Sequence, residues 1–234
     1  MSRRPPKAGS KSVSSRPGEV FVDLRDASFE DLLAFVFRRP AKGKGPGAKE
    51  WYWKLHVRLE IDPRVQIAFM TRLFRRSGIL RRRFSAGQIE DGFWFMIGPG
   101  GTEWFRVQLW NRHVPWALRK TCILSIPHLY EGVFRRSTGT MEFMLWDMLT
   151  EDYRFGGFLP KWKPEANRVR RTMLEALASQ LRLSHLDAQY SALHGLGHIG
   201  HPRARKILQE YSRKPRLRST HRRYAEEALK GETL

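Results

Sequence analysis

The C-terminal third of the chain repeats one short amphipathic pattern, and this repeat limits the fold more than any other feature. Ala192 and Leu196 recur 33 residues later as Ala225 and Leu229, each pair inside a helix-forming segment. A unit of this length cannot bury its apolar face alone, so successive units must stack on one another. Small residues at these positions also let neighbouring helices approach closely. The pattern therefore predicts stacked helices.

Hydrophobic periodicity predicts four consecutive helices over residues 166–182, 187–199, 202–213 and 218–230. The third of them begins at Pro202, because proline is favoured in the first turn of a helix. Its apolar stripe consists of Ala204, Ile207, Leu208 and Tyr211. Earlier helices are expected to begin near Ser28, Asp62, Ser85 and Pro115.

One segment follows a different period. Residues 51–61, WYWKLHVRLEI, alternate between apolar and polar side chains almost throughout. A period of two predicts a half-buried strand. Residues 20–22 and 104–109 are the candidate partners for it, although the helical surroundings of 104–110 favour a helix there.

The repeat resembles a known family. The stretch ALHGLGHIGHPRARKIL (192–208) is similar to a short bacterial HEAT-type repeat, which pairs an Ala-Leu-Gly helix with one started by proline. RVRRTMLEALASQL (168–181) resembles the first helix of another unit. The resemblance covers residues 164–231, and His201 stands where the family usually has aspartate. It implies an α-solenoid and a binding role, and it implies no reaction.

These patterns predict a mainly all-α protein. We expect a disordered basic tail over 1–18, an N-terminal helical capping region over 19–110 with a small β element at 51–61, and a HEAT-like α-α solenoid over 111–234. No apolar run is long enough to span a membrane and no secretory signal is evident, which predicts a cytoplasmic protein. The lone Cys122 excludes a disulfide framework within the chain.

Positive charge is concentrated in three places. The formal net charge is +20, of which residues 64–83 carry +7 and residues 161–234 carry +9, while the tail adds +5. Clustered arginine is typical of proteins that bind an anionic polymer. An arginine-rich composition with no binding role is the alternative.

The candidate contacts for a phosphate backbone lie in two groups. They are Arg75, Arg76, Arg81, Arg82, Arg83, Arg203, Lys206, Arg213, Lys214, Arg216, Arg218, Arg222 and Arg223. A nucleic-acid interface predicts that both groups share one concave face. Such contacts give salt-sensitive affinity with little dependence on sequence.

Histidines raise the question of a metal site. His194 and His198 stand four residues apart on one predicted helix, a spacing that can chelate a metal ion. Residue 195 is glycine and no acid follows, so a third ligand would have to come from His201 or from elsewhere. We therefore predict histidines at the surface and at helix ends, with no metal, no cofactor and no catalytic residue.

Three functions remain open. The first is a non-enzymatic scaffold whose basic surface holds a nucleic-acid backbone. The second is an adaptor for an acidic protein, which predicts an exposed apolar groove and scattered arginines. The third is a HEAT-like DNA-repair glycosylase, which needs an acid and an aromatic side chain in a basic groove. Trp146 and Asp147 match that group in residue type only, so no role is carried over to them. Neither a membrane nor a small-molecule substrate is indicated.

Overall fold

The computed structural model describes residues 19–43, 50–54, 56–98, 104–136, 139–150 and 164–232. The elements are β1 (Glu19–Asp23), α1 (Phe29–Phe37), α2 (Trp51–Lys54), β2 (His56–Glu60), α3 (Pro63–Arg75), η1 (Ser77–Ile79), α4 (Leu80–Arg83), α5 (Ala86–Ile97), α6 (Trp104–Val107), α7 (Trp116–Ser125), α8 (Pro127–Glu131), η2 (Val133–Arg135), α9 (Met141–Thr150), α10 (Pro164–Gln180), α11 (Leu186–His198), α12 (Pro202–Ser212) and α13 (Ser219–Lys230). The predicted tail, residues 1–18, lies outside the described residues.

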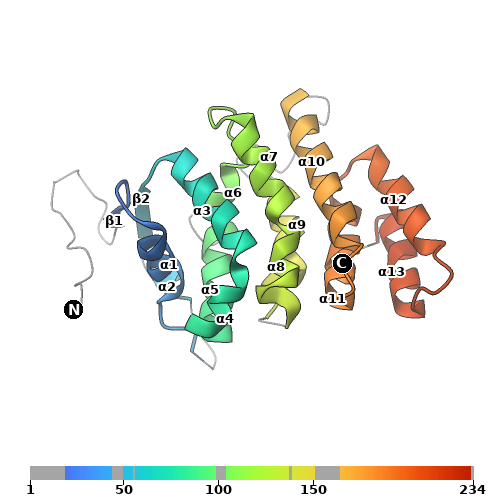
Figure 1. Cartoon of the computed structure of the whole chain (residues 1–234), viewed down its shortest axis with the longest axis horizontal. Helices are drawn as coiled ribbons and strands as arrows, with labels where there is room; N and C mark the ends of the chain where they lie inside the picture. The colour runs from blue at the N-terminus through green and yellow to red at the C-terminus, as the bar shows by residue number, and fades with distance from the viewer. Residues whose placement is uncertain are drawn as a thin grey trace.

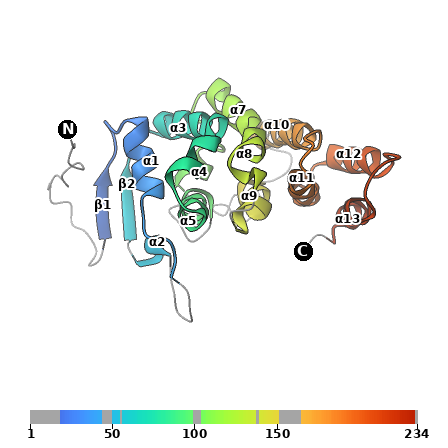
Figure 2. The same ribbon diagram turned by 60° about the horizontal axis from the view of Figure 1, so that its bottom comes forward.

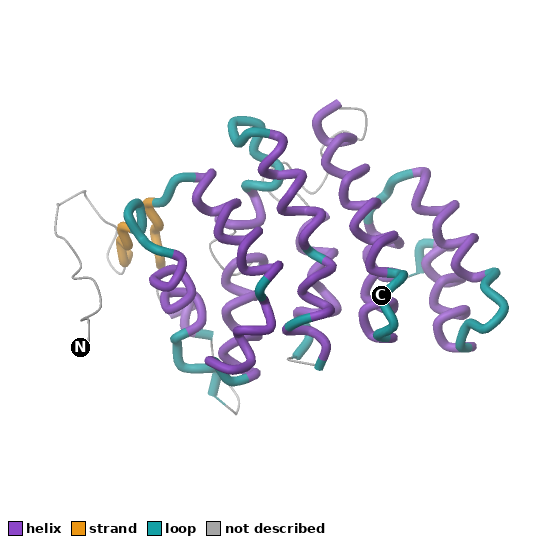
Figure 3. Tube along the Cα trace, in the orientation of Figure 1, coloured by secondary structure: helices purple, strands orange, loops and turns teal. Residues whose placement is uncertain are grey.

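The described residues are mostly helical and include a two-stranded sheet at the N-terminal end. Helices follow one another along the long axis of the molecule, from this sheet to α12 and α13 at the opposite end (Figure 1). A turn of the view by 60° separates them into two rows, with α3, α7, α10 and α12 in one and α5, α9, α11 and α13 in the other (Figure 2). Short loops join most of the successive helices (Figure 3).

The predicted strand at 51–61 is wrong over its first four residues. Trp51–Lys54 forms the helical turn α2, and only His56–Glu60 forms a strand. Alternation would place Trp51 and Tyr52 on opposite faces, but both side chains are buried and both contact the ring of Phe95. Because one aromatic cluster takes both side chains, a period of two cannot continue through this segment.

The strand β2 pairs in parallel with β1, so residues 20–22 are the partner and the alternative at 104–109 is wrong. In this register Phe21 lies opposite Arg58. Residues 104–107 are helical, as their surroundings favoured.

Local start signals place the upstream helices as predicted. Ser28 and Asp31 form a reciprocal capping box at α1, and Ser85 and Gln88 form another at α5. Asp62 caps α3 through its side chain. Each cap satisfies backbone N–H groups that have no partner within the helix, and this is why such residues define where a helix begins.

The last four helices begin and end within two residues of their predicted limits. In one row α7 contacts α10 and α10 contacts α12, and in the other α9 contacts α11 and α11 contacts α13. Contacts of α10 with α11 and of α12 with α13 join the rows. One continuous hydrophobic core runs from Leu24 to Ala228. Within the described part of the chain, no helix is both long enough and apolar enough to cross a membrane.

Candidate functional site

Asp147 of α9 and His194 of α11 meet in the interior between the two helices. His194 Nε2 lies 2.7 Å from Asp147 Oδ2. The side chain of His194 is 1% exposed and that of Asp147 is 10% exposed. Burying a carboxylate costs free energy unless it is paired, so this contact offsets part of the cost and joins α9 to α11.

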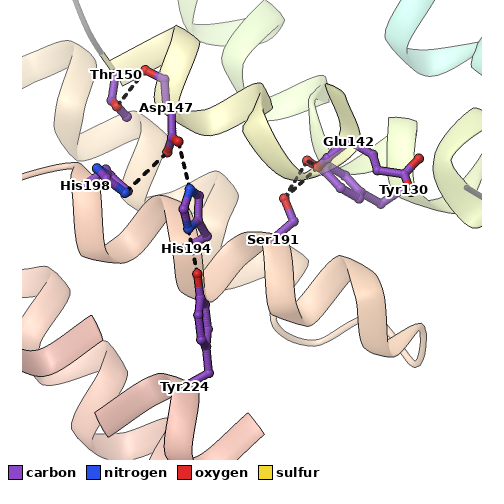
Figure 4. Close-up of polar contacts among 8 residues, drawn as sticks. All are labelled: Tyr130, Glu142, Asp147, Thr150, Ser191, His194, His198 and Tyr224. Atoms are coloured by element: carbon purple, nitrogen blue, oxygen red, sulfur yellow. Dashed lines mark hydrogen bonds and ion pairs between the residues drawn. The ribbon is translucent and has the colours of Figure 1, made fainter. Parts of the chain in front are cut away.

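Tyr224 of α13 extends this arrangement to a third helix. Its hydroxyl lies 2.6 Å from His194 Nδ1, so both ring nitrogens of His194 have partners. Figure 4 shows Asp147, His194 and Tyr224 in sequence from α9 through α11 to α13. A carboxylate can only accept, so Nε2 donates to Asp147, and in the neutral ring Nδ1 then accepts from Tyr224. Burial raises the pKa of Tyr224, which keeps its hydroxyl protonated.

His198 stands one helical turn after His194, on the same side of α11. Its Nε2 lies 3.8 Å from Asp147 Oδ1, and its side chain is 35% exposed. Asp147 Oδ1 is buried and has no hydrogen-bond partner. Asp147, His194 and His198 together offer three potential metal-ligand atoms within 4.8 Å of one another.

A close approach of α9 to α11 makes these contacts geometrically possible. A Cβ atom at Gly195 would lie 2.6 Å from Trp146 Cβ, closer than two such atoms can pack. The indole of Trp146 donates to Gln180 Oε1 at 2.9 Å, which anchors α9 against α10. Glycine at 195 therefore allows the approach that places Asp147 beside His194.

A second polar bridge supports the same register. Tyr130 Oη lies 2.8 Å from Ser191 Oγ, and both hydroxyls donate to the backbone carbonyl of Glu142 (Figure 4). This bridge joins α8, α9 and α11 beside the buried His194.

A separate open groove of about 1080 Å³ lies where α10, α11, α12 and α13 meet. Leu196 and Leu208 are buried and contribute an apolar floor. The charged side chains that line it are Arg170, Arg171, Arg205 and Lys230. None of the described lining residues is an aspartate or a glutamate. The groove is therefore uniformly basic.

Arg170 is the most buried of these cations. The residue is 7% exposed, and its Nη1 has no hydrogen-bond partner. Burial lowers the pKa of its guanidinium. The ring of Trp110 lies 5.6 Å from Cζ and supplies a cation–π contact. A buried guanidinium with an unused donor is costly alone and favours an anionic ligand.

His201 begins α12 at the edge of this groove. Its Nδ1 accepts a hydrogen bond from the backbone N–H of Arg203 at 3.1 Å. The ring thus supplies the side-chain cap of α12. Burial lowers the pKa of His201, and the nearby charges of Arg203, Arg171 and Arg170 lower it further.

The first predicted arginine group lies on α3 and α4. Arg75, Arg76 and Arg82 are exposed. Arg81 instead donates to the carbonyl of Val133, and Arg83 pairs with Glu30 at 2.6 Å. Two members of the densest cluster thus have structural partners.

The second predicted group lies on α12, on α13 and in the turn between them. Arg203, Arg213, Lys214, Arg216 and Arg218 are exposed. Lys206 and Arg223 pair with acids on their own helices, and Arg222 donates to the carbonyl of Lys214. The structure does not bring the two groups together, since the helices α7 to α11 lie between α4 and α12 (Figure 1).

Comparison with known proteins identifies no relative. No protein-family model, no curated protein and no solved structure matches this chain.

Sequence reasoning missed Asp147, Tyr224 and the arginines of α10. It predicted histidines at the surface and at helix ends, with any third metal ligand coming from His201 or from elsewhere. His194 is instead buried, and its partner Asp147 lies 47 residues earlier. One local signal was present. Asp147 falls among the apolar residues of α9, next to Met148, where a buried carboxylate requires a partner from another helix.

Proposed function

We propose that this protein is a non-enzymatic binding protein that holds the phosphate backbone of a nucleic acid against the basic surface of α10 to α13. The observation that carries the proposal is the groove, whose described lining holds no acid and includes Arg170, Arg171 and Arg205. A phosphate group in this groove would offset the charges of Arg170, Arg171 and Arg205.

A polymer fits this surface better than a small anion does. The exposed arginines of α12 and of the α12–α13 turn extend the positive charge beyond the groove. Contacts of this kind position a backbone and carry no base information, so we expect little sequence preference. Affinity would arise mostly from counterion release.

We also propose that the two rows of helices are a HEAT-like solenoid. Ala192 and Ala225, which are 33 residues apart, lie on α11 and α13, and these helices are neighbours in one row (Figure 2). In that arrangement one unit consists of α10 and α11, and the next unit consists of α12 and α13.

The observed contacts favour binding over base excision. A glycosylase of this architecture would need an acid and an aromatic side chain in the basic groove. Trp146 is fully buried and Asp147 is bonded to His194. Among the described residues that line the groove there is no Trp, Tyr, Phe, Asp or Glu.

The test measures binding of the full chain to labelled single- and double-stranded DNA and RNA across a salt series. Arg171→Gln with Arg205→Gln should weaken binding to all sequences alike. The slope of log K against log salt should fall by about one for each phosphate contact that is lost.

The matched control is Arg38→Gln with Arg64→Gln, which removes the same charge from exposed positions on α1 and α3. If this control weakens binding as much as the groove variant does, the groove is not the interface. Absence of binding near physiological salt would contradict the nucleic-acid proposal. A search for an acidic protein partner would then follow.

A further inference from the structure

We propose that Asp147, His194 and His198 form a binding site for a divalent transition-metal ion of the zinc class. This site is independent of the basic groove, because none of the three residues lines it. The inference goes beyond nucleic-acid binding and stands or falls separately from it.

The spacing of the ligand atoms is close to what such an ion needs. Zinc binds imidazole nitrogen and carboxylate oxygen at about 2.0–2.2 Å, so ligand atoms in a tetrahedral site lie about 3.3 Å apart. His194 Nε2 and Asp147 Oδ2 are 2.7 Å apart, and His198 Nε2 and Asp147 Oδ1 are 3.8 Å apart. All three ligand atoms lie within 4.8 Å of one another. Small side-chain rotations would bring the observed separations to those of a tetrahedral zinc site.

The buried carboxylate supplies an independent indication of a cation. Asp147 is 7% exposed, yet its Oδ1 has no hydrogen-bond partner. A buried carboxylate normally uses both oxygens, because each unsatisfied acceptor retains its desolvation cost. A metal ion beside Oδ1 would satisfy this atom.

Tyr224 matches the outer partner that metal-bound histidines require. A histidine that binds metal through one ring nitrogen almost always donates from the other to an oxygen. Tyr224 Oη lies 2.6 Å from His194 Nδ1, on the side of the ring away from Asp147. On metal binding, the proton of His194 would move from Nε2 to Nδ1, and the Nδ1–H would then donate a hydrogen bond to the Tyr224 oxygen.

The ligand set also indicates which ions would bind. Two imidazoles and one carboxylate suit zinc and its first-row neighbours, whereas magnesium and calcium prefer oxygen ligands throughout. Three protein ligands leave a fourth position for water or a bound molecule. The 35% exposed His198 places that position near the surface.

Equilibrium dialysis of the EDTA-treated, untagged full chain against ZnCl₂ tests the proposal. We expect one Zn²⁺ for each chain and no comparable binding of Mg²⁺. Zn²⁺ should also raise the melting temperature, because it binds only the folded chain. Cobalt should bind the same site and give the visible absorption of a four-coordinate ion.

His198→Ala is the decisive variant, since His198 lies at the surface and its loss leaves the Asp147–His194–Tyr224 contacts in place. It should abolish stoichiometric binding, whereas His113→Ala, at another exposed histidine, should not. Tyr224→Phe should weaken zinc binding by about 10- to 100-fold, the usual effect of losing an outer-shell partner.

Two results would overturn the proposal. One is the absence of Zn²⁺ binding at micromolar concentrations by a chain whose helical content is intact. The other is binding by His198→Ala with the affinity of the unaltered chain. In either case, Asp147, His194 and Tyr224 form a hydrogen-bonded chain between the three helices and not a metal site.

Discussion

At the scale of single residues, the buried His194 of α11 makes polar contacts with two other helices, α9 and α13. It pairs with Asp147 and Tyr224 through its two nitrogens, and its ring centroid lies 4.1 Å from that of Phe143. Its loss would remove the hydrogen-bond partner of Asp147 Oδ2 and of the Tyr224 hydroxyl. Removing one partner of such a pair costs more than removing both.

We therefore predict that His194→Ala destabilises the chain by about 3–5 kcal/mol, the range for removing one partner of a buried pair and leaving a buried carboxylate unpaired. Adding Asp147→Ala should cost less than the sum of the single changes, since no charge then remains unpaired. Urea unfolding at neutral pH measures the free energy of unfolding of the unaltered chain, the two single variants and the double variant. Strict additivity would show that the two side chains do not interact.

At the scale of elements, the start of α12 depends on a titratable cap. Arg203 N–H donates to His201 Nδ1 only while this nitrogen is unprotonated. Burial and three arginines lower the pKa of His201 in the folded chain. The unfolded chain therefore takes up the proton more readily than the folded chain does.

Stability should accordingly fall as the pH drops below about 6.5, the ordinary pKa of histidine. The expected loss is about 1 kcal/mol, the typical contribution of one N-cap. His201→Asn should remove this part of the dependence, because asparagine caps a helix without titrating. The measurement compares denaturant midpoints of both chains at pH 7.5 and 5.5. Equal losses in the two chains would contradict the prediction.

Local sequence patterns predict the individual helices well and fail where distant segments pack together. Prolines, caps and apolar stripes place α10 to α13 within two residues, because these signals act on the backbone nearby. Alternation failed at Trp51 and Tyr52, where packing against Phe95 from another helix decided the conformation. A cluster assembled from distant segments leaves no periodic signal.

At the scale of the whole molecule, α12 and α13 form one end of the two rows (Figure 1). Their packing partners are each other, α10 and α11, whereas α7 to α9 have neighbours on both sides. In a stack with nearest-neighbour contacts, a terminal pair opens before the central ones.

Hydrogen exchange should therefore be faster in α12 and α13 than in α9 under native conditions. Bound nucleic acid should slow exchange in α12, because the groove joins it to α10. Mass spectrometry of peptides from these helices measures both effects. Uniform protection from α7 to α13 would indicate a single cooperative unit instead.

The amino-acid sequence by itself determined the helical character of this chain, the limits of its C-terminal helices and the region of excess positive charge. These properties depend on residues that are near one another along the chain. Only the tertiary structure decided that Asp147, His194 and Tyr224 meet and that Arg170 and Arg171 share a groove with Arg205. Such contacts join separate helices, and their register follows from side-chain packing such as that of Trp146 on Gly195. No local pattern of residues encodes that packing.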